Sequence, residues 1–337
     1  MGDPALQQAK ITSPIPNRAS PPWSATSEQS FTLWPPTDML RRRFFPTTIA
    51  RMAASAAASS GGGAKVAAAV AAPVFVSCAA QYGVANVLGF GVSVATGWHY
   101  HLDLIGTGVF AVVALSCTGV HLRQRLSAFS VALWAVKLSG FLFYRALQVK
   151  HDGRLTDQLS TTKGTFNFWT ISAMWGILVS LPHVLAAGVP FASRPAFGLA
   201  TDVAGLALFS LGLLVETAAD YQKWQFKKDP TTSGQFCDVG VWQISQHANW
   251  FGNVTLWCGI YLLNLPTLWA GGAARTLGAL VSPAFLLALF YAQATDTVTH
   301  TRAMADAKYG ADANYKKYVT STPLVLPTPA SLARLFG

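Results

Sequence analysis

The sequence predicts an all-α membrane protein, a bundle of about seven transmembrane helices. Of its 337 residues, 52% are hydrophobic and only 11% are charged, whereas a soluble domain usually carries about 25% charged residues. The mean hydropathy is +0.36, and the apolar residues form long runs with few charges inside them. Such runs fit helices that cross a bilayer, because about 20 apolar residues span its hydrocarbon core.

Seven hydrophobic segments follow one another along the chain, and we expect each of them to be a helix. Every backbone polar group must be satisfied within lipid, which favours helices, and the alternating segments of a membrane barrel do not occur. Trp98 and Tyr100 follow the first segment, and such aromatic side chains favour the membrane interface. The predicted spans cover residues 66–95, 103–121, 126–144, 167–189, 197–217, 248–268 and 277–295.

The N-terminal residues 1–65 differ in composition from the rest of the chain. They are rich in Ser, Ala, Thr and Pro, and no acidic residue occurs from Met39 to Tyr100. An Arg-rich, Ser-rich and acid-poor N-terminus is typical of an organelle transit peptide. We therefore expect a disordered leader before a membrane domain at 66–330, and a plastid or mitochondrial membrane. A cytosolic tail on an endoplasmic-reticulum protein is the alternative.

The net charge of +10 comes from Lys and Arg in the N-terminal segment and in the loops between apolar runs. Positive loops of this kind set the orientation of a membrane protein, and no basic patch interleaved with aromatics indicates nucleic acid. The expected partners are the lipid bilayer and an apolar, lipid-like substrate. The four cysteines indicate neither a disulfide framework nor a metal site, so we expect them to be packing residues.

Three polar segments, 145–166, 218–247 and 296–337, separate or follow the predicted spans. Two spans lie between the first and second segments, and two lie between the second and third. All three segments must therefore face the same side of the membrane. A site assembled from distant parts of the chain could form on that side.

Four charged residues recur at helical spacing at the end of the fifth predicted span. They are Glu216, Asp220, Lys223 and Lys227, and this spacing places them on one face of a helix. Acids near a span boundary are costly unless they are paired or functional. The alternative is a solvated ladder of charges at the interface.

A dense group of polar and aromatic residues precedes the sixth predicted span. Gln246 and Asn249 can donate and accept hydrogen bonds, and Trp250 offers a stacking face. His247 could bind phosphate when protonated or relay a proton. Taken alone, His247 would more often be an interfacial histidine with a purely structural role.

This segment, GVWQISQHANWFGN from Gly240 to Asn253, resembles a signature of the steroid 5-alpha-reductase superfamily. In its broad branch of uncharacterised membrane proteins, the C-terminal domain reads G-x-W-x-x-S-R-H-P-N-Y-F-G-E. The upstream stretch LWAVKLSGFLFYRALQVKHDGRL and the tail KYGADANYKKYVTSTPLVLP resemble further motifs of the family in the same order. The resemblance covers residues 100–330.

The resemblance implies a membrane reductase that uses NADPH to reduce a carbon–carbon double bond in a lipid, with its cofactor motif at 216–327. Tyr144 and His247 are the candidate proton donors. Arg145 and Arg154 could meet the diphosphate or pair with Asp152, and an acid suits the ribose hydroxyls. The candidate cofactor-binding residues are Arg145, Asp152, Arg154, Glu216, Asp220, Lys223, Trp242, Gln246, His247, Asn249, Trp250, Tyr315 and Tyr318.

The sequence departs from the family signature at three positions. Gln246 stands in place of arginine, Ala248 in place of proline and Asn253 in place of glutamate. The first change removes a charge-assisted contact of about 1.5–3 kcal/mol. Two alternatives stay open: a methyltransferase that binds S-adenosylmethionine, as in the isoprenylcysteine methyltransferases, and a non-catalytic membrane subunit.

Overall fold

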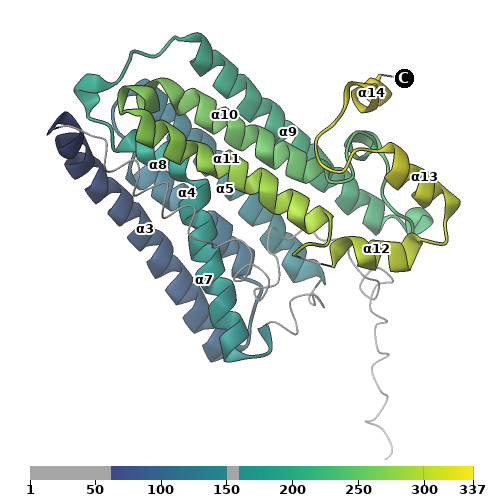
Figure 1. Ribbon diagram of the computed structural model, residues 1–337. Helices are drawn as coiled ribbons and strands as arrows, with labels where there is room; N and C mark the ends of the chain where they lie inside the picture. Colours follow the sequence, from purple (N-terminus) through teal and green to yellow (C-terminus); the bar gives the residue numbers. More distant parts are fainter. Residues whose placement is uncertain (1–61, 150–158, 299, 337) are drawn as a thin grey trace, which may run out of the picture.

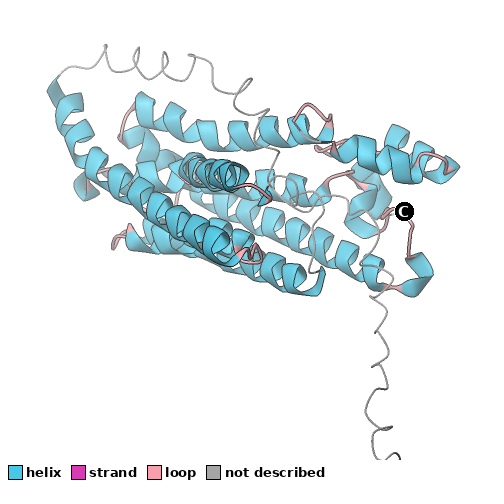
Figure 2. Ribbon diagram, turned by 90° about the horizontal axis from the view of Figure 1, so that it is seen from below, coloured by secondary structure: helices cyan, strands magenta, loops and turns pink. Residues whose placement is uncertain are grey.

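The computed structural model describes residues 62–149, 159–298 and 300–336, and throughout these ranges the chain is helical, with loops and no strands (Figures 1 and 2). The predicted all-α fold is confirmed. The predicted leader at 1–65 lies almost wholly outside the described residues. The bundle consists of α3 (Gly62–Thr96), α4 (Leu102–Ser116), α5 (Leu122–Val149), α7 (Thr162–Val179), α8 (Leu181–Ala187), α9 (Ala200–Lys228), α10 (Ala248–Ala270) and α11 (Ala273–Ala294).

Each of the seven predicted spans coincides with helix, but fewer helices meet the length and hydropathy of a complete membrane crossing. Four do so among the described residues: Pro73–Thr96 of α3, and the helices α5, α9 and α11. A fifth crossing results if α7 and α8, which meet at a bend of 58°, form one broken span. Of the remaining two, α4 has only 15 residues, and α10 contains the buried polar residues Asn249, Asn253 and Asn264. The four or five candidate crossings among the described residues indicate a membrane protein.

The helix ends that adjoin the three polar segments lie together at one end of the bundle (Figure 1). Near the end of α5, Tyr144 packs edge-on against Trp224 near the end of α9, with ring centroids 5.9 Å apart. Lys227 of α9 in turn donates a hydrogen bond of 3.0 Å to the hydroxyl of Tyr309. Residues near 145, 220 and 300 therefore lie at one end of the bundle, as expected if they share a side of the membrane.

Four glycines allow α9 and α10 to pack with their backbones in direct contact. A Cβ at Gly212 would lie 2.4 Å from the backbone nitrogen of Leu256, and one at Gly252 would lie 2.5 Å from that of Glu216. Gly205 and Gly259 repeat this close approach two turns away, each with a backbone nitrogen at 2.4 Å. No side chain larger than hydrogen fits at these positions, so the glycines set the distance between the two helices.

An aromatic cluster fills the middle of the bundle beside this helix pair. Trp134 of α5 and Trp257 of α10 pack edge-on, with ring centroids 5.1 Å apart. Phe110 of α4 contacts both rings and also Trp175 of α7. All four side chains are fully buried, and edge-to-face pairs of this kind each add about 0.5–1.5 kcal/mol beyond the burial of area.

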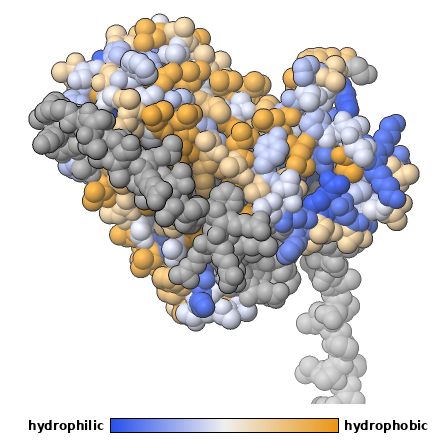
Figure 3. Space-filling view, in the orientation of Figure 1, coloured by the Kyte–Doolittle hydropathy of each residue, from blue (hydrophilic) through white to orange (hydrophobic). Residues whose placement is uncertain are grey.

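Short helices form a cap over the end of the bundle where α9 ends and α10 begins (Figure 1). They are α12 (Thr301–Tyr309), α13 (Ala313–Ser321), α14 (Pro329–Leu332) and the 3-10 turns η4 (Gly240–Gln243) and η5 (Ala333–Leu335). Figure 3 shows hydrophilic side chains gathered over this cap, while the visible face of the bundle is mostly hydrophobic. The cap is therefore the part of the molecule suited to water.

We predict that Gly212→Ala destabilises the protein by about 1–3 kcal/mol, because the added methyl group overpacks a backbone contact. Gly83→Ala is the matched control: it also lies within a helix, but a Cβ there has nothing within 4 Å. The control should be neutral or gain about 0.5–1 kcal/mol from helix propensity. Thermal unfolding in detergent measures both variants, and equal midpoints would contradict the contact between α9 and α10.

Candidate functional site

A buried glutamate, Glu216, accepts hydrogen bonds from three side chains of two other helices, α5 and α10. Lys137 Nζ of α5 lies 3.0 Å from its Oε2, and Asn253 Nδ2 of α10 lies 2.7 Å from its Oε1. The Trp134 indole nitrogen donates to the same Oε1 at 3.3 Å. Glu216 is only 3% exposed, and these donors offset the cost of removing its charge from water.

Asp220 extends this group by one helical turn. Its Oδ2 lies 3.5 Å from Lys137 Nζ, and the charge of the buried Arg145 also acts on it. Asp220 is 3% exposed, like Glu216. We call Lys137, Arg145, Glu216 and Asp220 the charge cluster; when all four are ionised, it holds two positive and two negative charges.

The alternative of a solvated ladder along this face of α9 is wrong for Glu216, Asp220 and Lys223, which are buried, whereas Lys227 is partly exposed. Lys223, one turn beyond Asp220, is also buried, and its Nζ lies 4.2 Å from the centre of the Trp242 ring. The Trp242 indole donates to the backbone oxygen of Ala219 at 3.0 Å. These contacts hold η4 against the C-terminal part of α9, next to the charge cluster.

The loop before α10 is fastened to the C-terminal tail by hydrogen bonds. The Gln246 backbone donates to the oxygen of Pro323 at 2.9 Å, and its side-chain amide donates to the oxygens of Val319 and Thr322 at 3.0 and 2.7 Å. Ser245 donates to the oxygen of Val325 at 2.8 Å. The neutral amide of Gln246 thus contacts two backbone carbonyls of the tail.

His247 and Trp250 form a stack at the start of α10. Their rings lie 4.0 Å apart and are nearly parallel, and Trp250 stacks on Phe290 of α11 at 5.2 Å. Burial, with the nearby charges of Lys223 and Arg302, lowers the pKa of His247 to about 3. His247 is therefore a neutral ring near pH 7, suited to packing and hydrogen bonding. Asn249 is buried beside it.

The two tail tyrosines have different partners. Tyr315 donates to the Asp306 carboxylate at 2.8 Å, and Tyr318 donates to the backbone oxygen of Trp242 at 2.8 Å. Burial raises the pKa of both phenols above the ordinary value, and Asp306 adds to the effect at Tyr315. Both stay protonated at neutral pH. Tyr318 therefore connects the tail directly to the turn that covers the charge cluster.

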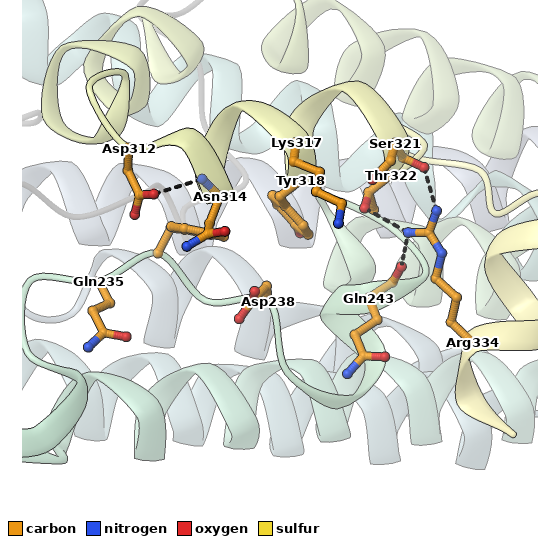
Figure 4. Close-up of a pocket in the computed structure, with 11 residues that line it drawn as sticks. Gln235, Asp238, Gln243, Asp312, Asn314, Lys317, Tyr318, Ser321, Thr322 and Arg334 are labelled. Carbon is orange, nitrogen blue, oxygen red and sulfur yellow. Dashed lines mark hydrogen bonds between the residues drawn. The ribbon is translucent and has the colours of Figure 1, made fainter. Parts of the chain in front are cut away.

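An open polar cavity of 720 Å³ lies on the outer side of this tail (Figure 4). Lys317 and Tyr318 of α13 form one wall, and Asp238 lies opposite. Arg334 closes one end, where it donates to the oxygens of Ser321 and Gln243 and to the hydroxyl of Thr322. The lining residues are Gln235, Phe236, Asp238, Gln243, Asp312, Asn314, Lys317, Tyr318, Ser321, Thr322 and Arg334.

The structure brings most of the predicted site residues into two adjoining groups. Arg145, Glu216 and Asp220 lie in the charge cluster. The cap, the adjoining end of α9 and the start of α10 with its preceding loop hold Lys223, Trp242, Gln246, His247, Asn249, Trp250, Tyr315 and Tyr318.

One predicted residue lies elsewhere. Tyr144 is 47% exposed and packs on Trp224, with Lys228 above its ring, away from the charge cluster. Asp152 and Arg154 lie outside the described residues.

Sequence reasoning missed Lys137 and the polar cavity. Lys137 is the sole charged residue between Arg125 and Arg145. A lysine inside an apolar run is costly unless it is paired, so this position carried a signal. The cavity is formed by residues from two distant segments, 235–243 and 312–334, and no local pattern in the sequence joins them.

We predict that Lys137→Met destabilises the protein by about 3 kcal/mol, because it leaves two buried carboxylates with one fewer positive partner. The double variant Lys137→Met/Glu216→Gln should recover part of this loss, since it also removes one negative charge. Denaturant titration in detergent measures both. Arg302→Met is the control: it removes an exposed ion pair with Asp306, which contributes about 0–1 kcal/mol. A double variant no more stable than the single one would contradict the cluster.

We also predict that acid destabilises the protein partly through His247. The pKa of His247 is lower in the folded chain than its ordinary 6.5, so its contribution to stability is complete above pH 6.5 and is lost as the pH falls toward 3. The variant His247→Gln should therefore lose less stability than the wild type between pH 6.5 and 5. The exposed His300 provides the control, His300→Gln, which should follow the wild type. Parallel pH profiles for all three proteins would exclude this role.

Comparison with known families gives one result. A family model described as a protein of unknown function, DUF1295, matches residues 89–322. The match takes in the charge cluster, η4 and both tail tyrosines, and it ends at Thr322. Comparison with curated proteins and with solved structures gives no match. Because the family model covers more than half of the chain, the chain belongs to the DUF1295 family of proteins of unknown function.

Proposed function

We propose that the protein is a membrane-embedded, NAD(P)H-dependent reductase of a carbon–carbon double bond in a lipid-like substrate. The observation that carries the proposal is the charge cluster. Four ionisable groups, Lys137, Arg145, Glu216 and Asp220, lie together inside a predominantly apolar bundle. Buried ionisable groups at membrane depth are costly, and they mark functional sites more often than structural ones. The motifs shared in order with the steroid 5-alpha-reductase superfamily support the same reading.

The polar residues of the cap fit a dinucleotide. The cavity of 720 Å³ falls within the range of about 300–1,000 Å³ typical of ligand pockets. Lys317 could meet a phosphate, and Asp238 or Asp312 could accept hydrogen bonds from ribose hydroxyls. Tyr318 lines the cavity and also bonds to Trp242, which lies under Lys223, one turn from Asp220. The cavity and the charge cluster are thus connected through a short chain of contacts.

A bound nicotinamide would supply the hydride, so the protein must supply a proton to the second carbon of the double bond. The Lys137 ammonium and the Asp220 carboxyl, 3.5 Å apart, are the groups best placed to hold and deliver that proton. We favour Lys137 and Asp220 for this role over Tyr144 and His247, the two donors expected from the sequence. Tyr144 lies on the outer surface, and His247 is neutral and stacked on Trp250.

An apolar groove in the structure supports the proposal that the substrate is lipid-like. It has a volume of 950 Å³ and lies between α3, α4 and α5, with Val136, Ser139 and Gly140 of α5 in its wall. Val136 precedes Lys137 in the sequence, so the groove and the charge cluster lie on neighbouring faces of α5. An apolar molecule that enters from the bilayer would approach the cluster along this helix. The composition of residues 1–65 supports a plastid or mitochondrial membrane as the location.

One observation favours a methyltransferase as the second candidate. The polar cavity contains two carboxylates, Asp238 and Asp312, beside its two cations Lys317 and Arg334. Carboxylates suit the sulfonium and amino groups of S-adenosylmethionine, and they repel the additional phosphate of NADPH. NADPH and S-adenosylmethionine therefore favour opposite charges in the same cavity, and a binding measurement distinguishes between the two proposals.

The test is a titration of the detergent-purified protein with NADPH, NADH and S-adenosylmethionine, followed by thermal unfolding. A ligand that binds only the folded state raises the unfolding midpoint. We expect NADPH to raise it, and we expect Lys317→Ala to weaken NADPH binding about tenfold or more, because a charge-assisted contact is worth about 1.5–3 kcal/mol. The control is Lys316→Ala, the neighbouring exposed lysine outside the cavity.

The other outcomes reassign the protein. Stabilisation by S-adenosylmethionine alone would identify a methyltransferase. Stabilisation by none of the three ligands at millimolar concentration would reject both enzymes and leave a non-catalytic membrane subunit. Equal loss of NADPH binding in Lys317→Ala and Lys316→Ala would remove the cavity from the cofactor site.

A further inference from the structure

Helices α5 and α9 start at the same level of the bundle, and both are longer than the hydrocarbon core of a bilayer is thick. A buried ion pair of 2.6 Å joins Arg123 in the first turn of α5 to Asp202 in the first turn of α9. The helices have 28 and 29 residues, which is about 42–44 Å at 1.5 Å per residue. A hydrocarbon core is about 30 Å thick. With their first turns at one boundary of the core, both helices extend by about two turns into the opposite headgroup layer.

An aromatic cluster lies on the outer face of α5 and α9 at the level of these last turns. Trp224 of α9 packs edge-on against Tyr144 and Phe141 of α5, with ring centroids 5.9 and 6.4 Å apart. Tyr144 is 47% exposed, and Tyr221, three residues before Trp224, is 60% exposed. Amphipathic rings of this kind favour the membrane interface. Two helices thus place such rings at the level that their lengths assign to the headgroups.

The ammonium group of Lys228 lies over the same rings. Its Nζ is 4.7 Å from the centre of the Trp224 ring and 5.9 Å from that of Tyr144, and both distances fit a cation–π interaction. Rings from two helices therefore hold this charge at the outer surface, where Lys228 is exposed. The adjacent acid, Asp229, accepts hydrogen bonds of 2.8 and 2.7 Å from the backbone and hydroxyl of Thr231. An anion that approaches Lys228 can also pack against the rings.

The outer face of α9 continues from this cluster into the membrane as an apolar surface. Leu214 lies seven residues, or two turns, before Tyr221 on the same face of the helix, and it is 68% exposed. The three acids of α9, Asp202, Glu216 and Asp220, are all buried on other faces. A molecule bound along the outer face therefore meets a positive charge at one end, hydrocarbon side chains at the other end, and no carboxylate between them. These are the properties of a site for an anionic amphiphile.

We propose that Lys228, Trp224 and Tyr144 bind the headgroup of an anionic phospholipid from the surrounding bilayer. The lipid phosphate pairs with the Lys228 ammonium group, the glycerol region packs on the rings, and an acyl chain follows the exposed side chain of Leu214. Basic groups at this level of a membrane attract anionic lipids. The site lies on the outer face of α9, whereas the charge cluster is buried on another face of the same helix, so this lipid is a partner separate from substrate and cofactor.

The experiment uses the full chain, purified in detergent, and native mass spectrometry to measure bound lipid. Phosphatidylglycerol and phosphatidylcholine with the same acyl chains are titrated separately, and we expect phosphatidylglycerol to bind more tightly. Lys228→Gln should weaken phosphatidylglycerol binding about fivefold, the effect of one basic residue near an anionic membrane surface. Lys228→Arg keeps the charge and should bind like the wild type. The control is Lys316→Gln, which removes an exposed lysine of α13 outside the cluster and should leave binding unchanged.

A second variant distinguishes this site from a general attraction between a basic protein and anionic lipid. Tyr144→Leu removes a ring beneath Lys228 but leaves the net charge unchanged, and the partly exposed position should tolerate leucine. We expect weaker phosphatidylglycerol binding, with a thermal unfolding midpoint in detergent close to that of the wild type. Equal affinity for the two lipids, equal losses in Lys228→Gln and Lys316→Gln, or full binding in Tyr144→Leu would each overturn the proposal. Displacement of the lipid by millimolar inorganic phosphate would also overturn it, because the site would then bind a free anion.

Discussion

The close contact between α9 and α10 is the constraint on which the rest of the structure depends. Gly205 and Gly212 of α9 face Gly259 and Gly252 of α10, and at each position the partner's backbone occupies the space of a Cβ. Because the helices approach so closely, the side chain of Asn253 reaches Glu216 with a hydrogen bond of 2.7 Å. With larger residues at the seam, the helices would separate and this bond would break. The glycines of the motif around α10 thus have a packing role that precedes any chemistry.

The charge cluster is a consequence of that packing, and burying it also costs folding free energy. Two carboxylates and two cations in an apolar bundle stabilise one another only if each keeps its partners, since a buried charge without them costs several kcal/mol. Trp134 and Asn253 supply neutral donors to Glu216, which leaves Lys137 able to contact both Glu216 and Asp220. A neutral asparagine at position 253 fits this arrangement better than a glutamate would. A third carboxylate beside Glu216 would lack a cation of its own.

Much of the fold could be predicted from the sequence, because lipid imposes simple rules. All seven apolar runs are helical, and counting spans placed the three polar segments at one end. The count of complete crossings was less reliable, since hydropathy alone does not separate a bent pair such as α7 and α8 from a straight span. The site was predicted where residues are close in sequence, as at Glu216 and Asp220. Lys137 was missed because its partner Glu216 is 79 residues away along the chain, and the polar cavity was missed because its two lining segments are also far apart in the sequence.

The hydrogen bonds between the loop before α10 and the tail also determine the order in which the protein can be completed. Ser245 and Gln246 bond to backbone oxygens 73 to 80 residues later, close to the end of the chain. During synthesis, α9, α10 and α11 can enter the membrane and pack before these partners exist. The cap closes over the charge cluster only when residues 319–325 have left the ribosome. A nascent chain that has not reached these residues therefore contains a packed helix pair with an open end, and enclosure of the site follows the packing of α9 against α10.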